Sequence, residues 1–282
     1  MIPGNFDYQA PKNIDEALAL IASNPEAKLL AGGHSLLPAM KLRLAQPALL
    51  VDLGRISGLS YVREAQGKIA VGAMTTHSAI AESSLLHAQS PLLAQAAKHI
   101  GDVQVRNRGT IGGSIAHADP AADYPAALLA LDAEITAHSK NGERTIMARD
   151  FFSGLFSTAL EPGEIIVEIR IPKTTGAGTA YEKFHHPASG FAVVGVAAVV
   201  RASAKGIESA SIGVTGVATH AFRAQAVETA LRGQPLSSLK TACARAAEGI
   251  DAIGDHFASS EYRRHLAAVY CERAVRAAAG RK

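Results

Sequence analysis

The sequence has 282 residues, of which 48% are hydrophobic and 19% charged, a composition typical of a globular protein. The net charge of +3 comes from 28 Lys and Arg against 25 Asp and Glu, and the basic residues form no run. This scatter argues against a nucleic-acid or anionic-membrane partner. The longest strongly apolar run, residues 191–200, is half of the roughly 20 residues that a transmembrane helix needs.

The first residues and the cysteines limit the possible functions further. The segment after Met1 has neither a basic nor an apolar stretch of the kind found in secretory signals, so we expect a cytoplasmic protein. Only two cysteines, Cys243 and Cys271, occur, whereas an all-cysteine iron–sulfur site needs four. We expect both to be buried, inert thiols. If the chain transfers electrons, it therefore needs an organic cofactor.

The first predicted unit has the order β–Gly loop–helix–β. Residues 15–22 have helical spacing with Asn13 as N-cap, and residues 28–31 read as a buried strand that leads into Gly32 and Gly33. A second helix is predicted to begin near Ser35, and residues 48–53 form another strand.

A second α/β unit follows. We expect a strand at 68–72, helices at 76–83 and 91–100, a Gly-rich segment at 109–119, and strands at 134–137 and 164–171. Asp123 is the predicted N-cap of a further helix that runs to about Leu131, with Pro125 just inside it.

The pattern changes after the flexible link at residues 173–178. Two β-rich runs, 192–201 and 208–218, have the spacing of an antiparallel pair, and helices are predicted at 222–231, 236–250 and 259–279. We place a domain boundary near Thr175. The predicted domains are therefore 1–175, with subdomains of about 1–55 and 56–175, and 176–282.

Two Gly-Gly pairs, each followed by a hydroxyl side chain, are the candidate ligand-binding segments of this sequence. Gly32-Gly33 precedes Ser35, and Gly112-Gly113 precedes Ser114. Glycine lets backbone N–H groups approach a phosphate closely, and successive N–H groups form an anion-binding nest. One such pair is more often an ordinary turn. Two pairs suggest two nests that face one diphosphate, and the sequence has neither a Walker A motif nor a Rossmann Gly-x-Gly-x-x-Gly motif.

These segments resemble the FAD loops of the medium subunit of aerobic carbon monoxide dehydrogenases. The similar motifs are Ala-Gly-Gly-His-Ser-Leu-Leu-Pro-Ala-Met-Lys at 31–41 and the long motif from Thr110 to Ala126. Ser-Glu-Tyr-Arg-Arg at 260–264 resembles the start of that family's last helix. Xanthine dehydrogenase contains a similar domain. The resemblance implies an α+β fold: a two-subdomain α/β FAD-binding domain of the PCMH/vanillyl-alcohol-oxidase type, followed by a C-terminal antiparallel sheet with helices.

The resemblance also implies partners. In such molybdenum hydroxylases a large molybdenum-cofactor subunit oxidises the substrate, a small subunit carries two [2Fe–2S] clusters, and the flavin passes electrons to an acceptor. We expect a dimer of heterotrimers, with FAD in this chain and the other cofactors in its partners. The acceptor (quinone, NAD or oxygen) stays open, as does the substrate: carbon monoxide, a purine, an aldehyde or an N-heterocycle.

The resemblance implies a set of cofactor-binding residues, each with a structural alternative. Asp123 could be only a helix cap, Lys183 a solvated surface lysine, and Ile100, Ile166 and Phe191 core residues. The expected FAD contacts are Leu29, Leu30, Ala31, Gly32, Gly33, His34, Ser35, Leu36, Ile100, Thr110, Ile111, Gly112, Gly113, Ser114, Asp123, Ile166 and Lys183.

Other functions remain as alternatives. His185-His186-Pro187 departs from a more basic stretch in relatives and could alter acceptor access, but it lacks the spacing of a metal site. No metal site and no catalytic acid–base residue is expected. A self-contained flavin oxidase would turn over alone, and a non-catalytic scaffold would not need both Gly pairs. A reductase of the 4-hydroxybenzoyl-CoA type would need additional cysteines.

Overall fold

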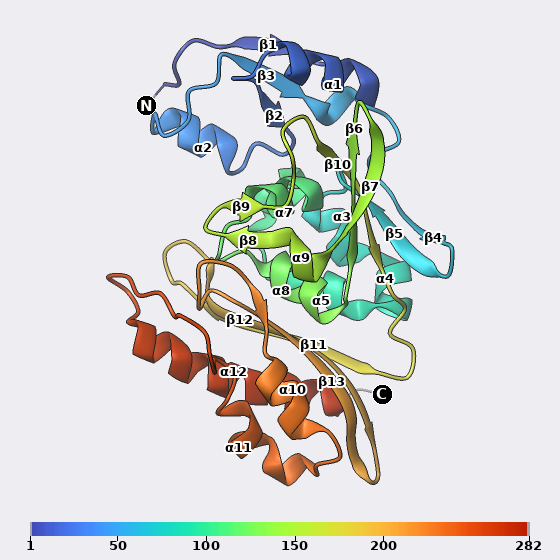
Figure 1. Ribbon diagram of the computed structural model, residues 1–282, viewed down its shortest axis with the longest axis vertical. Helices are drawn as coiled ribbons and strands as arrows, with labels where there is room; N and C mark the ends of the chain where they lie inside the picture. The colour runs from blue at the N-terminus through green and yellow to red at the C-terminus, as the bar shows by residue number, and fades with distance from the viewer. Residues whose placement is uncertain (1, 281–282) are drawn as a thin grey trace.

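The structure is a computed structural model that describes residues 2–280. Three regions follow one another along the longest axis of the molecule (Figure 1). The outermost residues of the predicted domains, 1 and 281–282, lie outside the described residues. Each region has its own hydrophobic core cluster, and strand β10 (Ile165–Ile171) contributes Ile165 to the cluster of the first region and Ile166 to that of the second. The first two regions are thus joined through a shared strand.

The first region is a small three-stranded parallel sheet with strand order β1-β3-β2. It contains the predicted β–Gly loop–helix–β unit, and the Asn13 side chain caps the first helix by accepting from Glu16 N at 2.9 Å. Strand β1 was not predicted from the sequence. The elements are β1 (Asp7–Gln9), α1 (Ile14–Ser23), β2 (Lys28–Leu30), α2 (Leu36–Lys41), β3 (Leu49–Asp52) and the 3-10 helix η1 (Leu53–Arg55).

The second region is a five-stranded antiparallel sheet with strand order β4-β5-β10-β6-β7, covered by helices. Its strands are β4 (Val62–Ala65), β5 (Lys68–Gly72), β6 (Glu134–Ser139), β7 (Gly142–Met147) and β10 (Ile165–Ile171), with a small hairpin of β8 (Phe152–Gly154) and β9 (Ser157–Thr158). Its helices are α3 (His77–Glu82), α4 (Ser84–Gln89), α5 (Pro91–Lys98), α6 (Val103–Arg108), α7 (Ile111–His117), α8 (Asp123–Ala130) and α9 (Ala148–Phe151).

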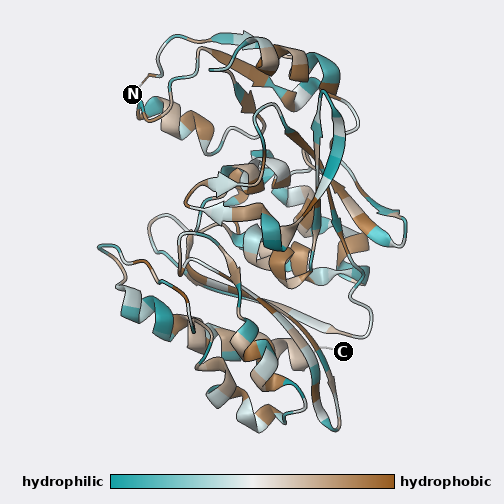
Figure 2. Ribbon diagram, viewed as in Figure 1, coloured by the Kyte–Doolittle hydropathy of each residue, from teal (hydrophilic) through white to brown (hydrophobic). Residues whose placement is uncertain are grey.

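The third region is a four-stranded antiparallel sheet with helices on one side, and the predicted pairing of its two long strands is confirmed. Figure 2 shows that the central strand β12 is largely hydrophobic, whereas the edge strand β7 of the second region is hydrophilic. The elements are β11 (Gly178–His185), β12 (Ala192–Ser203), β13 (Gly206–Thr215), β14 (Phe222–Arg223), α10 (Gln225–Leu231), η2 (Leu236–Ser238), α11 (Leu239–Cys243) and α12 (Ser260–Ala279).

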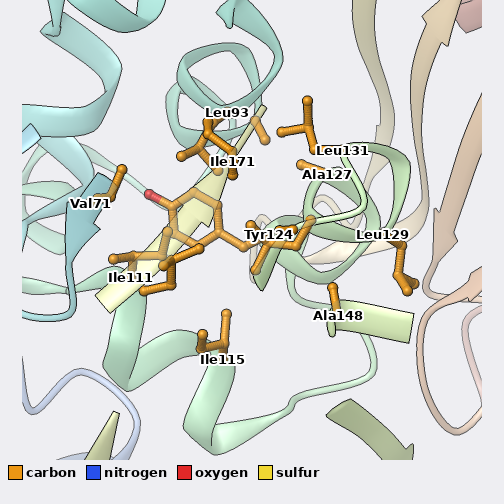
Figure 3. Close-up of a cluster of buried hydrophobic side chains, with 14 of the residues drawn as sticks. Val71, Leu93, Ile111, Ile115, Tyr124, Ala127, Leu129, Leu131, Ala148 and Ile171 are labelled. Carbon is orange, nitrogen blue, oxygen red and sulfur yellow. The ribbon is translucent and has the colours of Figure 1, made fainter. Parts of the chain in front are cut away.

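Helix α8 joins the second and third regions. Tyr124, in its first turn, is fully buried among Leu93, Ile111 and Ile171 (Figure 3), and its hydroxyl lies 3.1 Å from His77 Nδ1. On the other side α8 packs against β13, where a Cβ atom on Gly213 would lie 2.0 Å from Ala126 O. Because both sides of α8 are tightly packed, the position of Asp123 at its start is firmly set.

Two helix predictions were wrong in their extent. The predicted helix at 222–231 begins only at Gln225, because Phe222 and Arg223 pair with β13. The predicted helix at 236–250 is a 3-10 turn followed by α11, which ends at Cys243. Beyond it the backbone makes i→i+3 bonds typical of turns, such as Ala246 N to Cys243 O. Cys243 and Cys271 are free thiols, and both are buried, as the sequence predicts.

Candidate functional site

The structure brings the two Gly-Gly segments together from different regions. A Cβ atom on Gly32 would lie 2.2 Å from Arg108 O and 2.6 Å from Gly109 Cα, so the first segment rests directly on the backbone that leads into the second. A Cβ atom on Gly113 would lie 3.4 Å from Ala31 Cβ. Residues about 80 positions apart in the chain therefore form adjacent walls of one site, an arrangement that any side chain at Gly32 would prevent.

The first segment presents free backbone donors. Gly33 has a left-handed φ of +75°, and His34 Nδ1 lies 2.8 Å from Gly32 O. Within residues 2–280 the N–H groups of Gly33, His34 and Ser35 have no hydrogen-bond acceptor, and the Ser35 hydroxyl caps nothing. Consecutive free N–H groups around a left-handed glycine form the type of nest that accepts an anion.

The second segment is the first turn of a helix, which was not predicted within the Gly-rich segment at 109–119. Helix α7 begins at Ile111, and its N-cap Thr110 accepts from Gly113 N at 3.2 Å. Gly112 packs on Ala73, because its own Cβ atom would lie 2.6 Å from Ala73 Cβ, whereas Gly113 is exposed. The Ser114 hydroxyl has no partner in the described part of the chain. The exposed Gly113 and the half-buried Ser114 thus lie beside the first segment.

A buried ion pair lies at the junction of the second and third regions. Lys183 Nζ is 2.8 Å from Asp123 Oδ1, and their side chains are 0% and 5% exposed. The Tyr181 hydroxyl donates to Asp123 Oδ1 at 2.6 Å, and Lys183 Nζ donates to His99 O at 2.9 Å. Both alternatives considered for these residues were wrong. Helix α8 starts at Asp123 with Ala122 as its N-cap, so the Asp123 carboxylate caps nothing, and Lys183 is not a surface lysine.

Burial governs protonation in this cluster. Desolvation raises the pKa of the Asp123 carboxyl, while the nearby Lys183 ammonium and the Tyr181 hydrogen bond act in the opposite direction. Burial and the adjacent carboxylate raise the pKa of Tyr181 well above 10, so the phenol stays protonated and donates. Removing one partner of a buried pair typically costs about 3–5 kcal/mol, since the remaining charge is left uncompensated. The cluster is therefore a tightly held ion pair in which the Asp123 carboxylate fixes the position of the Lys183 ammonium.

Histidines surround this ion pair. His99 Nδ1 lies 3.4 Å from His185 Nε2, and the two rings stack with centroids 5.4 Å apart. Desolvation, His185 and Lys183 together lower the pKa of His99 to about 4, and burial and Lys183 lower that of His185. Both rings are therefore neutral at pH 7. His99 immediately precedes Ile100, whose carbonyl oxygen accepts from Arg106 Nη1 at 2.9 Å.

The remaining predicted residues divide between site and core. Ile100 lies half-buried beside the histidines, and Phe191 is 45% exposed just before β12. Ile166 is 5% exposed within the core of the second region. Its neighbour Val167 accepts from Ala73 N, and Ala73 packs against Gly112. The structure thus places Ile166 in the core, one residue from the backbone that supports the second segment.

Sequence reasoning missed Tyr181, His99, Arg106 and His77. Tyr181 could have been found, since it lies two residues before Lys183 on a strand and so shares a face with it. His99 contributes a backbone carbonyl at a helix end, which no residue pattern reveals. Within residues 2–280 no three His, Cys, Asp or Glu residues are grouped so that they could hold a metal ion. In the same range no helix is long and apolar enough to cross a membrane.

Comparison with known proteins assigns both parts of the chain. Residues 4–174 match the family described as the FAD binding domain in molybdopterin dehydrogenase. Residues 179–278 match the CO dehydrogenase flavoprotein C-terminal domain. Such a match over more than half of the chain identifies a family and a cofactor type, but not a substrate.

The relatives are similar over their full length. The carbon monoxide dehydrogenase medium chain of Hydrogenophaga pseudoflava is 43% identical over 284 residues, covering 99% of this chain and 98% of the relative. The alpha subunit of the 6-hydroxypseudooxynicotine dehydrogenase complex of Paenarthrobacter nicotinovorans is 39% identical, with 98% and 95% covered. A solved structure of carbon monoxide dehydrogenase from Hydrogenophaga pseudoflava, lacking the Mo-pyranopterin moiety, aligns with a TM-score of 0.95 at 44% identity, covering 99% of this chain and 98% of that one.

Proposed function

Because the chain belongs to the family of FAD-binding subunits of molybdopterin dehydrogenases, we propose that it relays electrons from the [2Fe–2S] clusters of a partner subunit through FAD to an external acceptor. In this proposal a large subunit with the molybdenum cofactor oxidises the substrate. The complex is a cytoplasmic dimer of heterotrimers. The two cysteines of this chain are too few for a cluster, which supports this division of roles.

The observation that carries the proposal is the juxtaposition of the two Gly-Gly segments. The first segment, with three free N–H groups at Gly33, His34 and Ser35, lies beside the exposed Gly113 and the half-buried Ser114. These groups fit a diphosphate, which needs several donors and no intervening side chain. We assign FAD contacts to residues of the first segment, Leu29, Leu30, Ala31, Gly32, Gly33, His34, Ser35 and Leu36, and of the second, Thr110, Ile111, Gly112, Gly113 and Ser114. Within this set the diphosphate is assigned to Gly32, Gly33, His34, Ser35, Thr110, Gly112, Gly113 and Ser114.

The flavin ring is assigned to the side of the site where Ile100, Asp123 and Lys183 meet, with Ile166 behind the second segment. FAD supplies the reversible uptake of one or two electrons. Lys183 places a positive charge where negative charge develops on reduction, and Asp123 and Tyr181 hold that charge in position. The protein contributes position and electrostatics, and none of these residues needs to transfer a proton.

The substrate of the whole complex is not selected by these residues. Relatives at 43% and 39% identity are named for carbon monoxide and for 6-hydroxypseudooxynicotine, although both resemble this chain over nearly its whole length. The similarity of the FAD-binding chain is therefore shared by complexes with different substrates. We propose a molybdenum hydroxylase and leave its substrate to the partner subunit.

Gly113→Val tests the assignment. The branched side chain would fill the surface beside Ala31 and Thr110, while the helix below it is otherwise unchanged. We expect purified wild-type protein to show oxidised-flavin absorption with two visible bands. The variant should lose this absorption and unfold at the same midpoint as wild type from which FAD has been removed.

Gly154→Val is the matched control. Gly154 has an ordinary φ, and an added Cβ atom would only reach Ser157 Cβ at 3.8 Å. The control should keep its flavin. Equal flavin occupancy in Gly113→Val and wild type would remove the second segment from the binding site, and a colourless wild-type complex would refute the flavin relay.

A further inference from the structure

Two cationic side chains meet at the C-terminal end of helix α5. Carbonyl groups at this end of a helix have no partner within the helix and carry partial negative charge, so they attract cations. Lys183 Nζ donates to His99 O at 2.9 Å. Arg106 Nη1 donates to both Ile100 O and Gly101 O, each at 2.9 Å. Three successive carbonyl groups of one turn therefore bind an ammonium and a guanidinium group.

The turn that holds Arg106 has little freedom to move. Gly101 has a left-handed φ of +47°, and a Cβ atom there would lie 2.8 Å from both Cβ and Cγ1 of Val105. Val105 and Arg106 belong to helix α6, whose first turn is capped by Asp102, because the Asp102 carboxylate accepts from Val105 N at 2.8 Å. The half-buried Arg106 side chain is therefore held in a fixed position against the turn.

Arg106 and Lys183 differ in the charge that surrounds them. Lys183 lies 2.8 Å from Asp123 Oδ1, so this pair carries no net charge. The two carbonyl groups are the only hydrogen-bond partners of the Arg106 side chain in residues 2–280, and no carboxylate there forms an ion pair with it. The nearby rings of His99 and His185 are neutral at pH 7, because burial lowers the pKa of both imidazoles. Arg106 is therefore an uncompensated cation.

The charge of Arg106 is felt at the junction of the two Gly-Gly segments. His77 lies beneath this junction, since a Cβ atom on Gly109 would be 2.5 Å from His77 Nε2, and Gly109 supports the first segment. Burial, together with His34 and Arg106, lowers the pKa of His77 to about 4. Arg106 is thus bonded to the turn of Ile100 and is close enough to the junction to affect a group buried under it.

We infer that Arg106 supplies a net positive charge to the flavin side of the site and thereby raises the reduction potential of the bound flavin. The inference rests on the proposed assignment of the ring to the side where Ile100 and Lys183 lie. A reduced flavin carries more negative charge than an oxidised one, so an uncompensated cation stabilises the reduced form more. The opposite charges of Lys183 and Asp123 largely cancel beyond their immediate surroundings.

The test removes this charge from the FAD-loaded full chain. Arg106→Gln removes the charge but keeps an amide N–H that can donate to a backbone carbonyl, whereas Arg106→Lys keeps the charge. Lys98→Gln is the matched control, because Lys98 is exposed at the end of the same helix α5 and its side chain has no hydrogen bond or ion pair in the described part of the chain.

Val103→Glu is a second way to neutralise Arg106, and it leaves the guanidinium and its two hydrogen bonds in place. Val103 is 63% exposed and lies one helical turn before Arg106 in α6. Side chains three residues apart on a helix are neighbours, so the new carboxylate can pair with the guanidinium.

The reduction potential is measured by anaerobic titration with dithionite in the presence of an indicator dye. At the midpoint potential of wild type, the ratio of reduced to oxidised flavin should be at least about tenfold lower in Arg106→Gln, a downward shift of about 30 mV for a two-electron couple. Val103→Glu should shift the ratio in the same direction by a smaller factor. Arg106→Lys and Lys98→Gln should stay within about twofold of wild type, because the first keeps the charge and solvent screens the second.

The affinity for oxidised FAD, measured by equilibrium dialysis, distinguishes an effect on the ring from one on the diphosphate. The oxidised ring is neutral, so Arg106→Gln should bind oxidised FAD nearly as tightly as wild type. A large loss of this affinity with an unchanged potential would assign Arg106 to the diphosphate and overturn the inference.

Two further outcomes would overturn it. An unchanged potential in both Arg106→Gln and Val103→Glu would show that the charge does not reach the ring. Equal shifts in Arg106→Gln and Arg106→Lys would show that the hydrogen bonds to the turn matter and the charge does not. In all these cases wild type still binds a reducible flavin, and the electron relay stands. A wild-type protein that binds no flavin would instead refute the relay itself.

Discussion

The two Gly-Gly segments share a sequence pattern but differ in structure. Gly32-Gly33 forms an open loop with a left-handed residue and unpaired N–H groups. Gly112-Gly113 forms the first turn of a helix whose N–H groups bond to Thr110 and Ala73. A Gly-Gly pair in this sequence therefore indicates positions where a side chain is absent, and it does not predict one particular backbone conformation.

Within each segment the two glycines have different reasons to lack a side chain. Gly32 and Gly112 are required by packing, the first between regions and the second within one region. Gly33 is required by its φ of +75°. Gly113 is the only one of the four with neither a left-handed φ nor a Cβ position closer than 3.0 Å to a neighbour, so neither backbone conformation nor packing requires a glycine there. This is the position where our proposal places a ligand.

Gly32→Ala should have the largest effect, because the added Cβ atom would lie 2.2 Å from Arg108 O, a backbone atom that cannot rotate away. The first region would have to move off the second. We expect the free energy of unfolding to fall by about 3 kcal/mol, the upper end for overpacking, together with loss of FAD. Urea unfolding and flavin absorbance measure both, and stability within about 0.5 kcal/mol of wild type would contradict the close contact.

His77 makes the support of the second segment sensitive to pH. It is buried, its backbone N–H donates to Gly109 O at 2.9 Å, and desolvation, with His34 and Arg106, lowers the pKa of its imidazole to about 4. The unfolded chain, with a pKa of 6.5, binds the proton more readily, so stability is complete above pH 6.5 and falls as the pH drops toward 4. At pH 5 the loss attributable to His77 is about 2 kcal/mol.

The matched variant for this prediction is His77→Gln, which cannot titrate. Urea unfolding at pH 7.5 and pH 5 should show a larger loss in wild type than in the variant, by about 2 kcal/mol. Equal losses would mean that His77 is protonated in the folded protein. The histidine of the first segment, His34, is exposed.

Local sequence patterns were sufficient to predict many of the helices and strands. Hydrophobic periodicity located α1, α5, α12 and the long strands β12 and β13, because each of these buries one face or lies entirely in a core. The short edge strands β1, β4 and β7 were not predicted. They are mostly exposed, so their pairing partners and not their own residues decide their conformation.

The candidate site was predictable where it depends on single residues and unpredictable where it depends on contacts. The Gly pairs and Lys183 are visible in the sequence. The Asp123–Lys183 pair joins residues 60 positions apart, and the sequence could not show that Tyr181 and His99 O complete its hydrogen bonds. Aspartate is common at helix N-caps, but Asp123 is buried against β11, where its carboxylate pairs with Lys183.

Gly33→Ala and Gly113→Ala separate backbone strain from ligand access. A non-glycine residue in the left-handed conformation of Gly33 costs about 1–2 kcal/mol. Gly113 has an ordinary φ, and its Cβ atom would contact only Thr110 Oγ1 at 3.0 Å and Ala31 Cβ at 3.4 Å. We expect thermal or urea unfolding to show the loss in Gly33→Ala alone, with Gly113→Ala within about 0.5 kcal/mol of wild type. Equal losses of stability in the two variants would mean that the backbone conformation requires glycine at both positions.

The smallest effects come from the hydroxyl side chains beside each pair. Thr110 accepts from Gly113 N as the N-cap of α7, so Thr110→Ala should lower the free energy of unfolding by about 1 kcal/mol. Ser35 stands at the corresponding position before α2 but makes no cap hydrogen bond, so Ser35→Ala should change stability by less than about 0.5 kcal/mol. If the Ser35 hydroxyl meets a phosphate, that variant should release FAD at a lower urea concentration than its own unfolding requires. A stability loss in Ser35→Ala as large as that in Thr110→Ala would show instead that the first segment is a capped helix start like the second, and the contrast between an open nest and a helical turn would disappear.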